Sequence, residues 1–375
     1  MPRTKIHNAI RSSAFRRWGR VLALLGSGGL LQAQGFVADG PSGNSLRAQA
    51  KLNDRGDVLV CDRLHNRVIE LNPGQQTVWQ FGDGGSVAGP TSVVGPTDAM
   101  RIGQLTFICG TGLLPGETPD CPYGCQDNRV IAVDSTGTIV WQYGQAGVPG
   151  SCPGQLNRPT YAVLLDGHRV LITDQGNHRV ILVDWQGNLL WQYGMTGMPG
   201  SGPGQLDSPS SALHLVNNHY VIADTGNNRV VEVNPQKQVV WEYQKDARTG
   251  CPCNGPTFAS RESDGNTLIC DTGNNRVLEV DPAGTLFWLY NTSLRQGSVP
   301  NPRPSRAVRL RNGHILISDQ FNQQVIEITQ DKQIVYTYGT LAGATRTGVA
   351  ADLNGPHDAK AIGDFTGLPI PCPPK

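Results

Sequence analysis

Apolar and polar positions follow one pattern that recurs along the chain at intervals of roughly 47 to 63 residues. Each unit holds four short segments: Pro-x-x-Ala, an apolar run that ends at Asp, Arg-Val followed by alternation, and an aromatic pair. Short apolar runs and strict alternation are typical of strands, and Gly and Pro at each junction are typical of turns. Four strands per unit, repeated six times, predict an all-β fold, a six-bladed β-propeller with four-stranded antiparallel blades.

A seven-residue turn phrase joins the second and third predicted strands of each unit. It reads DTGNNRV at residues 224–230 and returns almost unchanged at 271–277. Its Asp and Arg positions are filled by Asp62, Asp174, Asp224, Asp271 and Asp319, and by Arg67, Arg129, Arg179, Arg229 and Arg276. We interpret them as structural, because Asp accepts backbone N–H bonds in a tight turn and Arg pairs well with a carboxylate. The alternative interpretation is a calcium or ligand ring built from the Asp side chains.

The glycines of the phrase are expected to adopt a positive φ, and its asparagines are suited to the left-handed region. These glycines are Gly176, Gly226 and Gly273. Two units depart from the phrase. In the second unit Gly110 replaces the Asp and residues 111–126 form an insertion, and in the sixth unit Gln324 replaces the Arg.

The turn phrase, the preceding Pro-x-x-Ala segment and the Gly-rich passages 144–159 and 194–209 resemble the NHL-repeat family of propellers, of exported bacterial type. The resemblance covers about residues 46–340 and implies an interaction scaffold. The Trp-x-Tyr segments also resemble arylsulfotransferase-like and quinoprotein-type propellers, less specifically.

The end of the chain contains one more first strand. Residues 355–360 (GPHDAK) are a near copy of 95–100 (GPTDAM). This segment either closes the ring against the N-terminal region or joins residues 36–39 in a degenerate seventh blade, and we favour six blades.

The first 33 residues have the pattern of a signal peptide, with a basic start, a short apolar stretch and Ala33 near the end. We therefore expect a leader at 1–33 and a single propeller domain at 34–375, with a closing segment at 341–375, secreted or periplasmic. The Arg16-Arg17 pair leaves both Sec and twin-arginine export open. No later stretch is long and apolar enough to span a membrane.

The nine cysteines divide into two groups. Cys61, Cys109 and Cys270 share one repeat position, which indicates a small buried residue. The others lie in Gly- and Pro-rich segments, where Cys121 and Cys125 are spaced for a local disulfide. A metal site is the alternative for these loop cysteines, but no His stands at zinc-finger spacing from them.

Candidate chemistry is expected on the innermost strand of each blade. One parity of this strand ends in Arg101, Leu164, His214, Arg261 and Arg309, and we predict an anion-binding site at the channel mouth from Arg101, His214, Arg261 and Arg309. The opposite parity is more mixed, with Asp98, Tyr161, Ser211, Phe258 and Arg306.

The charge of 31 basic against 30 acidic residues gives no sign of a nucleic-acid-binding protein. We favour a non-enzymatic scaffold that binds a ligand, a protein, a peptide or an extracellular polymer, with the insertion as a possible specificity loop. The alternative is an exported enzyme with an axial site, either a metal-dependent lyase or hydrolase or an arylsulfotransferase-like enzyme. No cofactor is predicted, and a divalent metal is left open. Only His214 and His357 lie on candidate inner strands.

Overall fold

The repeated units fold as six four-stranded antiparallel sheets in a computed structural model, which describes residues 56–166, 168–344 and 352–364. Blade one contains β24 (Pro356–Ala361), β1 (Val58–Asp62), β2 (Arg67–Leu71) and β3 (Thr77–Phe81). Blade two contains β4 (Pro96–Ile102), β5 (Leu105–Gly110), β6 (Arg129–Val133) and β7 (Ile139–Gly144). Blade three contains β8 (Pro159–Leu164), β9 (Arg169–Asp174), β10 (Arg179–Asp184) and β11 (Leu189–Tyr193).

The last three blades repeat this order from the inner to the outer strand. Blade four contains β12 (Ser211–His214), β13 (Tyr220–Asp224), β14 (Arg229–Val233) and β15 (Val239–Tyr243). Blade five contains β16 (Phe258–Arg261), β17 (Thr267–Asp271), β18 (Arg276–Val280) and β19 (Leu286–Asn291). Blade six contains β20 (Pro304–Arg309), β21 (Ile315–Asp319), β22 (Gln324–Ile328) and β23 (Ile334–Tyr338). The all-β, six-bladed prediction is therefore confirmed.

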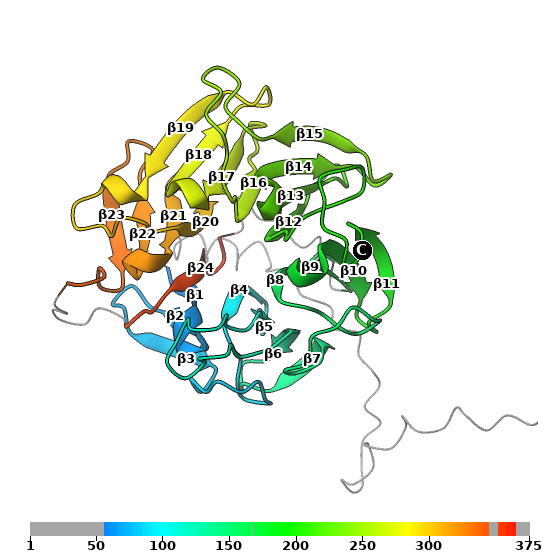
Figure 1. The fold of residues 1–375 in the computed structure, drawn as a ribbon. Coiled ribbons are helices and arrows are strands. Elements are labelled where there is room, and N and C mark those ends of the chain that lie inside the picture. Colours follow the sequence, from blue (N-terminus) through cyan, green and yellow to red (C-terminus); the bar gives the residue numbers. More distant parts are fainter. Residues whose placement is uncertain (1–55, 167, 345–351, 365–375) are drawn as a thin grey trace, which may run out of the picture. The chain divides into compact units, whose positions relative to one another are not determined.

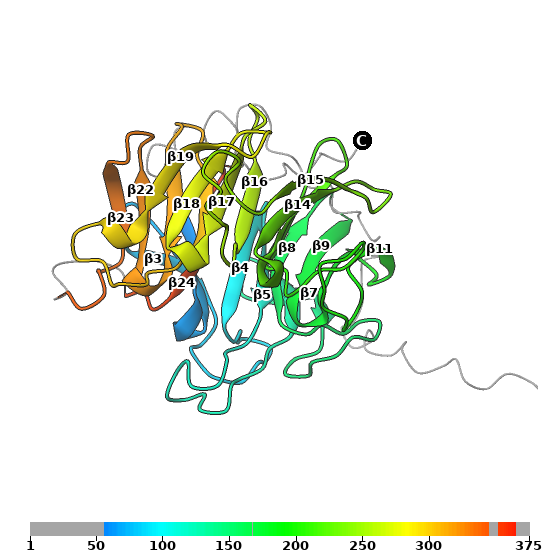
Figure 2. The ribbon, with the colours of Figure 1, turned by 45° about the horizontal axis from the view of Figure 1, so that its top comes forward.

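The C-terminal strand closes the ring. β24 pairs antiparallel with β1, so that Ala359 lies opposite Val60 and Asp358 opposite Cys61. Around the axis the six inner strands contact one another in the order β24, β4, β8, β12, β16, β20 and back to β24 (Figure 1). Neighbouring inner strands such as β4 and β8 run side by side (Figure 2). Of the two closures predicted for residues 355–360, pairing with the N-terminal region is thus the one found.

The packing between blades uses the residues that the repeat predicts. Cys61, Cys109 and Cys270 are fully buried, as expected for their repeat position. Three outer-strand tryptophans donate from Nε1 to a carbonyl of the next blade, as in the 2.9 Å bond from Trp141 to Trp185 O. The helices of the described ranges are single 3₁₀ turns, none of which could cross a membrane. The predicted leader, 1–33, lies outside the described residues and stays a prediction.

The turn phrase forms a 3₁₀ turn closed by a buried ion pair. The turns are η1 (Arg63–His65), η2 (Gln175–Asn177), η3 (Thr225–Asn227), η4 (Thr272–Asn274) and η6 (Gln320–Asn322), and η5 (Thr292–Leu294) follows β19. In blade four, Arg229 Nε donates to Asp224 Oδ2 at 2.7 Å, and Asp224 Oδ1 accepts the N–H of Asp207 in the preceding inter-blade segment at 2.7 Å. We call this Asp–Arg pair with its backbone bond the pin.

The pin recurs in the other blades that keep the phrase. The Arg Nε to Asp Oδ2 distances are 2.8 Å for Arg67–Asp62, 2.8 Å for Arg179–Asp174 and 2.6 Å for Arg276–Asp271. Each of these Asp side chains is fully buried. The structural interpretation of the phrase, with Arg bound to a carboxylate of its own blade, therefore agrees with the geometry.

The glycines of the phrase do not adopt a positive φ, so that expectation is wrong. The left-handed residue is the one two positions later: His178 with φ 56°, Asn228 with φ 54° and Asn275 with φ 57°. Gly226 is needed for space instead, because a Cβ there would lie 2.5 Å from Asp207 Cγ and 2.9 Å from Asp207 O. Glycine lets the preceding inter-blade segment approach the turn closely enough to form the pin.

Blade two rebuilds the pin from a residue outside the phrase. Gly110 occupies the Asp position, and Asp127, at the far end of the insertion, supplies the carboxylate. Arg129 Nε donates to Asp127 Oδ1 at 2.6 Å, and Val94 N donates to Asp127 Oδ2 at 2.7 Å. A Cβ on residue 110 would lie 2.3 Å from Asp127 Cγ, so glycine makes room for the substitute carboxylate.

In blade six the arginine of the pin is replaced, and the substitute lies farther from the carboxylate. Gln324 stands at the Arg position, and the guanidinium comes from Arg295, whose Nε lies 3.4 Å from Asp319 Oδ2. Burial raises the pKa of Asp319 to about 6, and the more distant Arg295 does not offset it. This Asp is the weakest point among the described pins.

We expect Asp224→Ala to destabilise the protein by about 3–5 kcal/mol, because it leaves Arg229, Asn227 and the Asp207 N–H without their acceptor in a buried place. Urea unfolding followed by circular dichroism measures the change. Asp331→Ala, in the exposed hairpin between β22 and β23, is the matched control and should change stability little. Equal losses in both variants would contradict the role assigned to the pin.

We expect Asp319 to lower the stability of the protein as the pH rises from about 4 to about 6. Over this range the folded state keeps a proton on Asp319, whose pKa is about 6, while the unfolded chain has lost it near pH 3.9. The free energy of unfolding of Asp319→Asn, minus that of the wild type, should therefore rise by about 2 kcal/mol across this range. Urea unfolding at pH 4, 5, 6 and 7 tests this, and a constant difference would refute it.

Candidate functional site

The arginines predicted at the channel mouth lie at the interfaces between neighbouring blades. Arg261 Nη2 donates to Glu232 Oε2 at 2.7 Å, and its guanidinium carbon lies 4.6 Å from the centre of the Trp241 ring. Arg101 Nη2 lies 3.1 Å from Glu70 Oε2 in the same way. In each case the Arg stands on an inner strand and the Glu on the third strand of the preceding blade. These guanidinium groups are thus partnered by carboxylates.

Of the two remaining members of the predicted set, Arg309 follows the same arrangement and His214 does not. Arg309 Nη2 lies 2.5 Å from Glu279 Oε2, and its Nε lies 3.4 Å from Glu262 Oε2. His214 has no such carboxylate and packs against Tyr220, with ring centres 5.1 Å apart; burial lowers its pKa. The four residues therefore lie at separate interfaces between blades, and an anion site formed by them stays a prediction.

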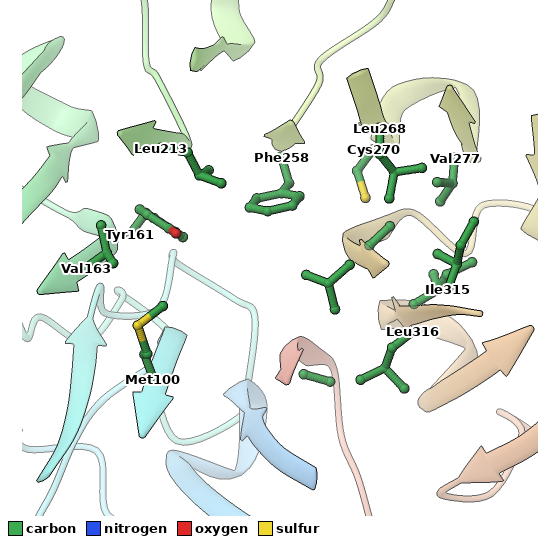
Figure 3. Packing of buried hydrophobic residues seen from close by; sticks show 14 of the residues in the cluster. Met100, Tyr161, Val163, Leu213, Phe258, Leu268, Cys270, Val277, Ile315 and Leu316 are labelled. Carbon is green, nitrogen blue, oxygen red and sulfur yellow. The ribbon is translucent and has the colours of Figure 1, made fainter. Parts of the chain in front are cut away.

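A different set of six side chains meets at the axis. The residue before the Ala of each Pro-x-x-Ala segment gives one ring position per blade, which we call the axial ring: Asp98, Tyr161, Ser211, Phe258, Arg306 and Asp358. All six are between 0% and 3% exposed. Figure 3 shows Tyr161 and Phe258 directed toward the same central region. This is the parity that the sequence left as a mixed set.

Four charges are joined in and beside the axial ring. Arg306 Nη2 donates to Asp98 Oδ1 at 2.8 Å, and its Nε lies 2.8 Å from Asp358 Oδ1 without hydrogen-bond alignment. Lys360 Nζ donates to Asp98 Oδ1 and Asp358 Oδ2, at 2.6 Å each. The two carboxylates and two cations therefore cancel in formal charge within the buried centre of the ring.

Aromatic rings complete the environment of the buried guanidinium. Arg306 Cζ lies 4.2 Å from the ring centre of Phe258 and 4.9 Å from that of Tyr161. Such contacts stabilise a cation that has lost its water. They also explain why an arginine is tolerated at a position that is almost fully buried.

The two carboxylates differ in their proton affinity. Burial raises the pKa of Asp98 despite the nearby Lys360 and Arg306. Burial would also raise the pKa of Asp358, but Arg306 and Lys360 outweigh it and lower the pKa. Both carboxylates are held by cations, so neither is placed as an unpaired general base.

The sequence contains a signal for this network in the two near-identical first strands. Residues 95–100 and 355–360 are near copies, and Lys360 replaces Met100 on the same parity as Asp98 and Asp358. Opposite charges on one parity of two neighbouring inner strands indicate contact. What the sequence alone did not show is that Arg306, from blade six, lies within reach of both.

The insertion of blade two folds back as a closed loop. Leu113 and Cys125 form a β-bridge, and the predicted disulfide between Cys121 and Cys125 is confirmed, with Cα atoms 5.5 Å apart. Glu117 accepts two hydrogen bonds from Arg63 of η1, at 2.9 and 2.7 Å. The loop is therefore fixed both to itself and to blade one.

This loop exposes an apolar surface. Tyr123 is 93% exposed and Leu114 is 44% exposed, and Val87, in the inter-blade segment before blade two, is 77% exposed. Their neighbours in the chain are buried: Val94, Leu113 and Cys121 form a cluster to which Ala88 and Leu64 pack. We call Val87, Leu114 and Tyr123 the insertion patch. Its exposed side chains rest on a fixed base.

Across residues 56–166, 168–344 and 352–364, no group of three or more His, Cys, Asp or Glu side chains is arranged to hold a metal ion. His357 is half-buried on β24, where its Nδ1 lies 2.8 Å from Thr97 O, and desolvation lowers its pKa to about 3. A neutral imidazole bound in this way holds β24 against β4.

A family model described as outer membrane protein assembly factor BamB matches residues 55–254 and 126–352. No protein with a curated description matches the sequence. Among solved structures, a protein of unknown function from Bacteroides caccae is 13% identical, with 75% of this chain and 92% of that chain covered and a TM-score of 0.52.

Two further structures are similar at lower TM-scores. Virginiamycin B lyase from Staphylococcus aureus is 13% identical, over 79% of this chain and 83% of that chain, with a TM-score of 0.48. BamB from Moraxella catarrhalis is 16% identical, over 74% of this chain and 72% of that chain, with a TM-score of 0.39. At such identities, structural likeness speaks for the fold alone.

We expect Arg306→Met to destabilise the protein by about 3–5 kcal/mol, because it leaves two buried carboxylates against Lys360 alone. Adding Asp98→Asn should recover part of that loss, since one carboxylate and one cation then remain. Chemical unfolding of the two single variants and the double variant forms a double-mutant cycle. Strictly additive losses would show that Arg306 and Asp98 do not act together.

Proposed function

The chain belongs to the family described as outer membrane protein assembly factor BamB, and from this premise we propose that it is an exported propeller that binds another protein of the cell envelope. The insertion patch is the proposed contact surface. The proposed location is the periplasm, in agreement with the leader expected at residues 1–33. The NHL-like turn phrase is compatible with this function, because its Asp and Arg side chains bind each other in the pins.

The observation that carries the proposal is the fixed, apolar surface of the insertion. Exposed aromatic side chains at the centre of a preorganised patch are typical anchors of protein interfaces. Tyr123 is almost fully exposed, yet its loop is held by a disulfide and by the Arg63–Glu117 pair. A fixed loop loses little conformational entropy on binding, so more of the contact energy appears as affinity.

The side chains at the axis favour a binding protein over an enzyme. Asp98 and Asp358 are both bound by Lys360 and Arg306, and the ring is closed to solvent. A general base needs a carboxylate that is within reach of its substrate and not occupied by a cation. The proposed function therefore places recognition on the surface and leaves the axial ring to hold the blades.

We expect a photoreactive amino acid in place of Tyr123 to crosslink the full chain to one envelope protein in the source organism. The same substitution at Val239, an exposed residue of the outer strand β15, is the control and should give no such product. Mass spectrometry identifies the product. Crosslinks of equal yield at both positions, or none at residue 123, would refute the proposed surface.

We also expect Tyr123→Ser to weaken binding to that purified partner by at least about tenfold, as for other interface anchors. Calorimetric titration measures the affinity, and an unchanged melting temperature shows that the loop still folds. Unchanged affinity would place the binding site elsewhere on the propeller.

A further inference from the structure

One position at the start of the inner strands has an unusual backbone conformation in all six blades. The residue before the Pro of each Pro-x-x-Ala segment has a positive φ, between 48° and 63°: Gly95, Arg158, Ser208, Gly255, Arg303 and Gly355. Glycine adopts such a φ freely, whereas a residue with a Cβ is strained there. Three of the six residues are glycines, so a longer side chain is kept at this position against the preference of the backbone.

The structural task of this position needs no side chain. Its N–H donates to the side chain of the left-handed turn residue of the preceding blade, as Gly95 N does to Asn66 Oδ1 at 2.8 Å. Arg158 N makes the same bond to Asn128 Oδ1 at 2.9 Å. Because glycine meets this need in blade two, the bond does not explain the arginine of blade three. Strained residues that the fold does not require are concentrated at functional sites.

Arg158 is half-buried, and its guanidinium has no carboxylate partner among the described residues. Every other Lys or Arg side chain that is buried or half-buried in residues 56–166, 168–344 and 352–364 forms an ion pair with an Asp or a Glu. Arg158 is therefore the one exception to a rule that this propeller otherwise follows.

The charged groups nearest to Arg158 do not compensate it. Arg63 donates to Glu117 through both Nη atoms, at 2.9 and 2.7 Å, and Glu117 Oε2 also accepts the N–H of Leu114 in the insertion patch, at 2.6 Å. The charges of Arg63 and Glu117 cancel, so Arg158 leaves one positive charge in excess. Burial and the positive charge of Arg63 lower the pKa of the Arg158 guanidinium, and Glu117 only partly offsets them.

Arg158 is joined to both ends of the insertion. At the start of the insertion, Thr111 Oγ1 donates to the carbonyl oxygen of Pro159, the residue after Arg158, at 2.5 Å. Just after its end, Asn128 Oδ1 accepts the Arg158 N–H. The loop that carries the exposed Tyr123 is thus flanked by a cation without a counterion. Such a surface fits a partner segment in which a carboxylate lies next to an apolar side chain.

We propose, resting on the proposed function, that Arg158 is the charged contact of the insertion patch and binds an Asp or Glu side chain of the partner protein. A guanidinium binds a carboxylate through two parallel hydrogen bonds, which fixes the orientation of the partner as well as its position. The contact gives Arg158 the counterion that the described chain does not supply, and it accounts for an arginine at a position suited to glycine.

The full chain with a photoreactive amino acid at position 123 provides the test in the source organism. In this chain Arg158→Gly should reduce the yield of the crosslinked product at least about tenfold, because the carboxylate of the partner loses its cation. Arg303→Gly is the matched control. Arg303 holds the same position in blade six, with φ 52°, but is exposed and lies outside the insertion, so its loss should leave the yield unchanged.

The outcomes distinguish this inference from the proposed function. The absence of any product when only residue 123 is changed overturns the proposed function and this inference with it. A product whose yield Arg158→Gly leaves unchanged overturns this inference alone. An equal loss in Arg158→Gly and Arg303→Gly overturns it too, because the backbone position and not the charge beside the insertion would then be responsible.

Melting temperatures separate a contact with the partner from support of the loop. Arg158→Gly removes a side chain from a left-handed position, so the variant should melt no lower than the wild type. Weaker crosslinking together with a lower melting temperature would show that Arg158 holds the insertion in place, and would overturn the proposal.

The purified partner from the crosslink allows a direct test of the charge. Calorimetric titration at about 0.05 and about 0.5 M sodium chloride should show an affinity that falls with salt for the wild type and falls less for Arg158→Gly. Arg158→Glu combined with the opposite exchange, Asp or Glu to Arg, in the partner should recover binding that either change alone removes. Equal salt responses, or no recovery for any acidic residue of the partner near the crosslink, would contradict the pairing.

Discussion

The buried Asp–Arg pin is the interaction on which the other features of this propeller depend. One carboxylate accepts a bond from the Arg of its own blade, closes the 3₁₀ turn and holds the inter-blade segment that leads to its blade, as Asp224 does with Arg229 and Asp207 N. A charge buried without these bonds would cost several kcal/mol. The pin is therefore rebuilt where the sequence loses it, by Asp127 in blade two and by Arg295 in blade six. The position of each inner strand follows from these fixed turns.

Most of the fold could be predicted from the sequence because it is local and repeated. The spacing from Asp to Arg and from Arg to the aromatic pair sets strand lengths and turns, and six copies make the pattern unmistakable. The substitute pins could not be predicted in the same way. Asp127 supplies the carboxylate that the other blades carry at the position of Gly110. Only the space that Gly110 leaves, for want of a side chain, shows that this replacement is possible.

The axis was harder to predict for a related reason. Inner strands are buried on both faces, as the fully buried β8 shows, so the hydrophobic pattern does not tell which parity meets at the centre. The parity of Arg101, Arg261 and Arg309 looked like a channel mouth, yet those residues pair with Glu70, Glu232 and Glu279 of the preceding blades. The repeat also indicates this pairing. Blades three and four have Leu164 and His214 at the Arg position, and the blade before each of them has Ala132 or Leu182 at the Glu position.

Function is expected where the repeat is broken without harm to the pins. Because Asp127 lies after the insertion, the carboxylate of the blade-two pin comes from downstream of it, while Gly112 N at the start of the insertion donates to Val94 O of the inter-blade segment. The loop is then free to take on its own disulfide, its ion pair with Arg63 and its exposed Tyr123. The axial ring differs from blade to blade for a similar reason, since the Ala beside it keeps the strand packing while the ring position varies. Repetition thus secures the fold, and the departures from it set the insertion and the axial ring apart from the rest of the propeller.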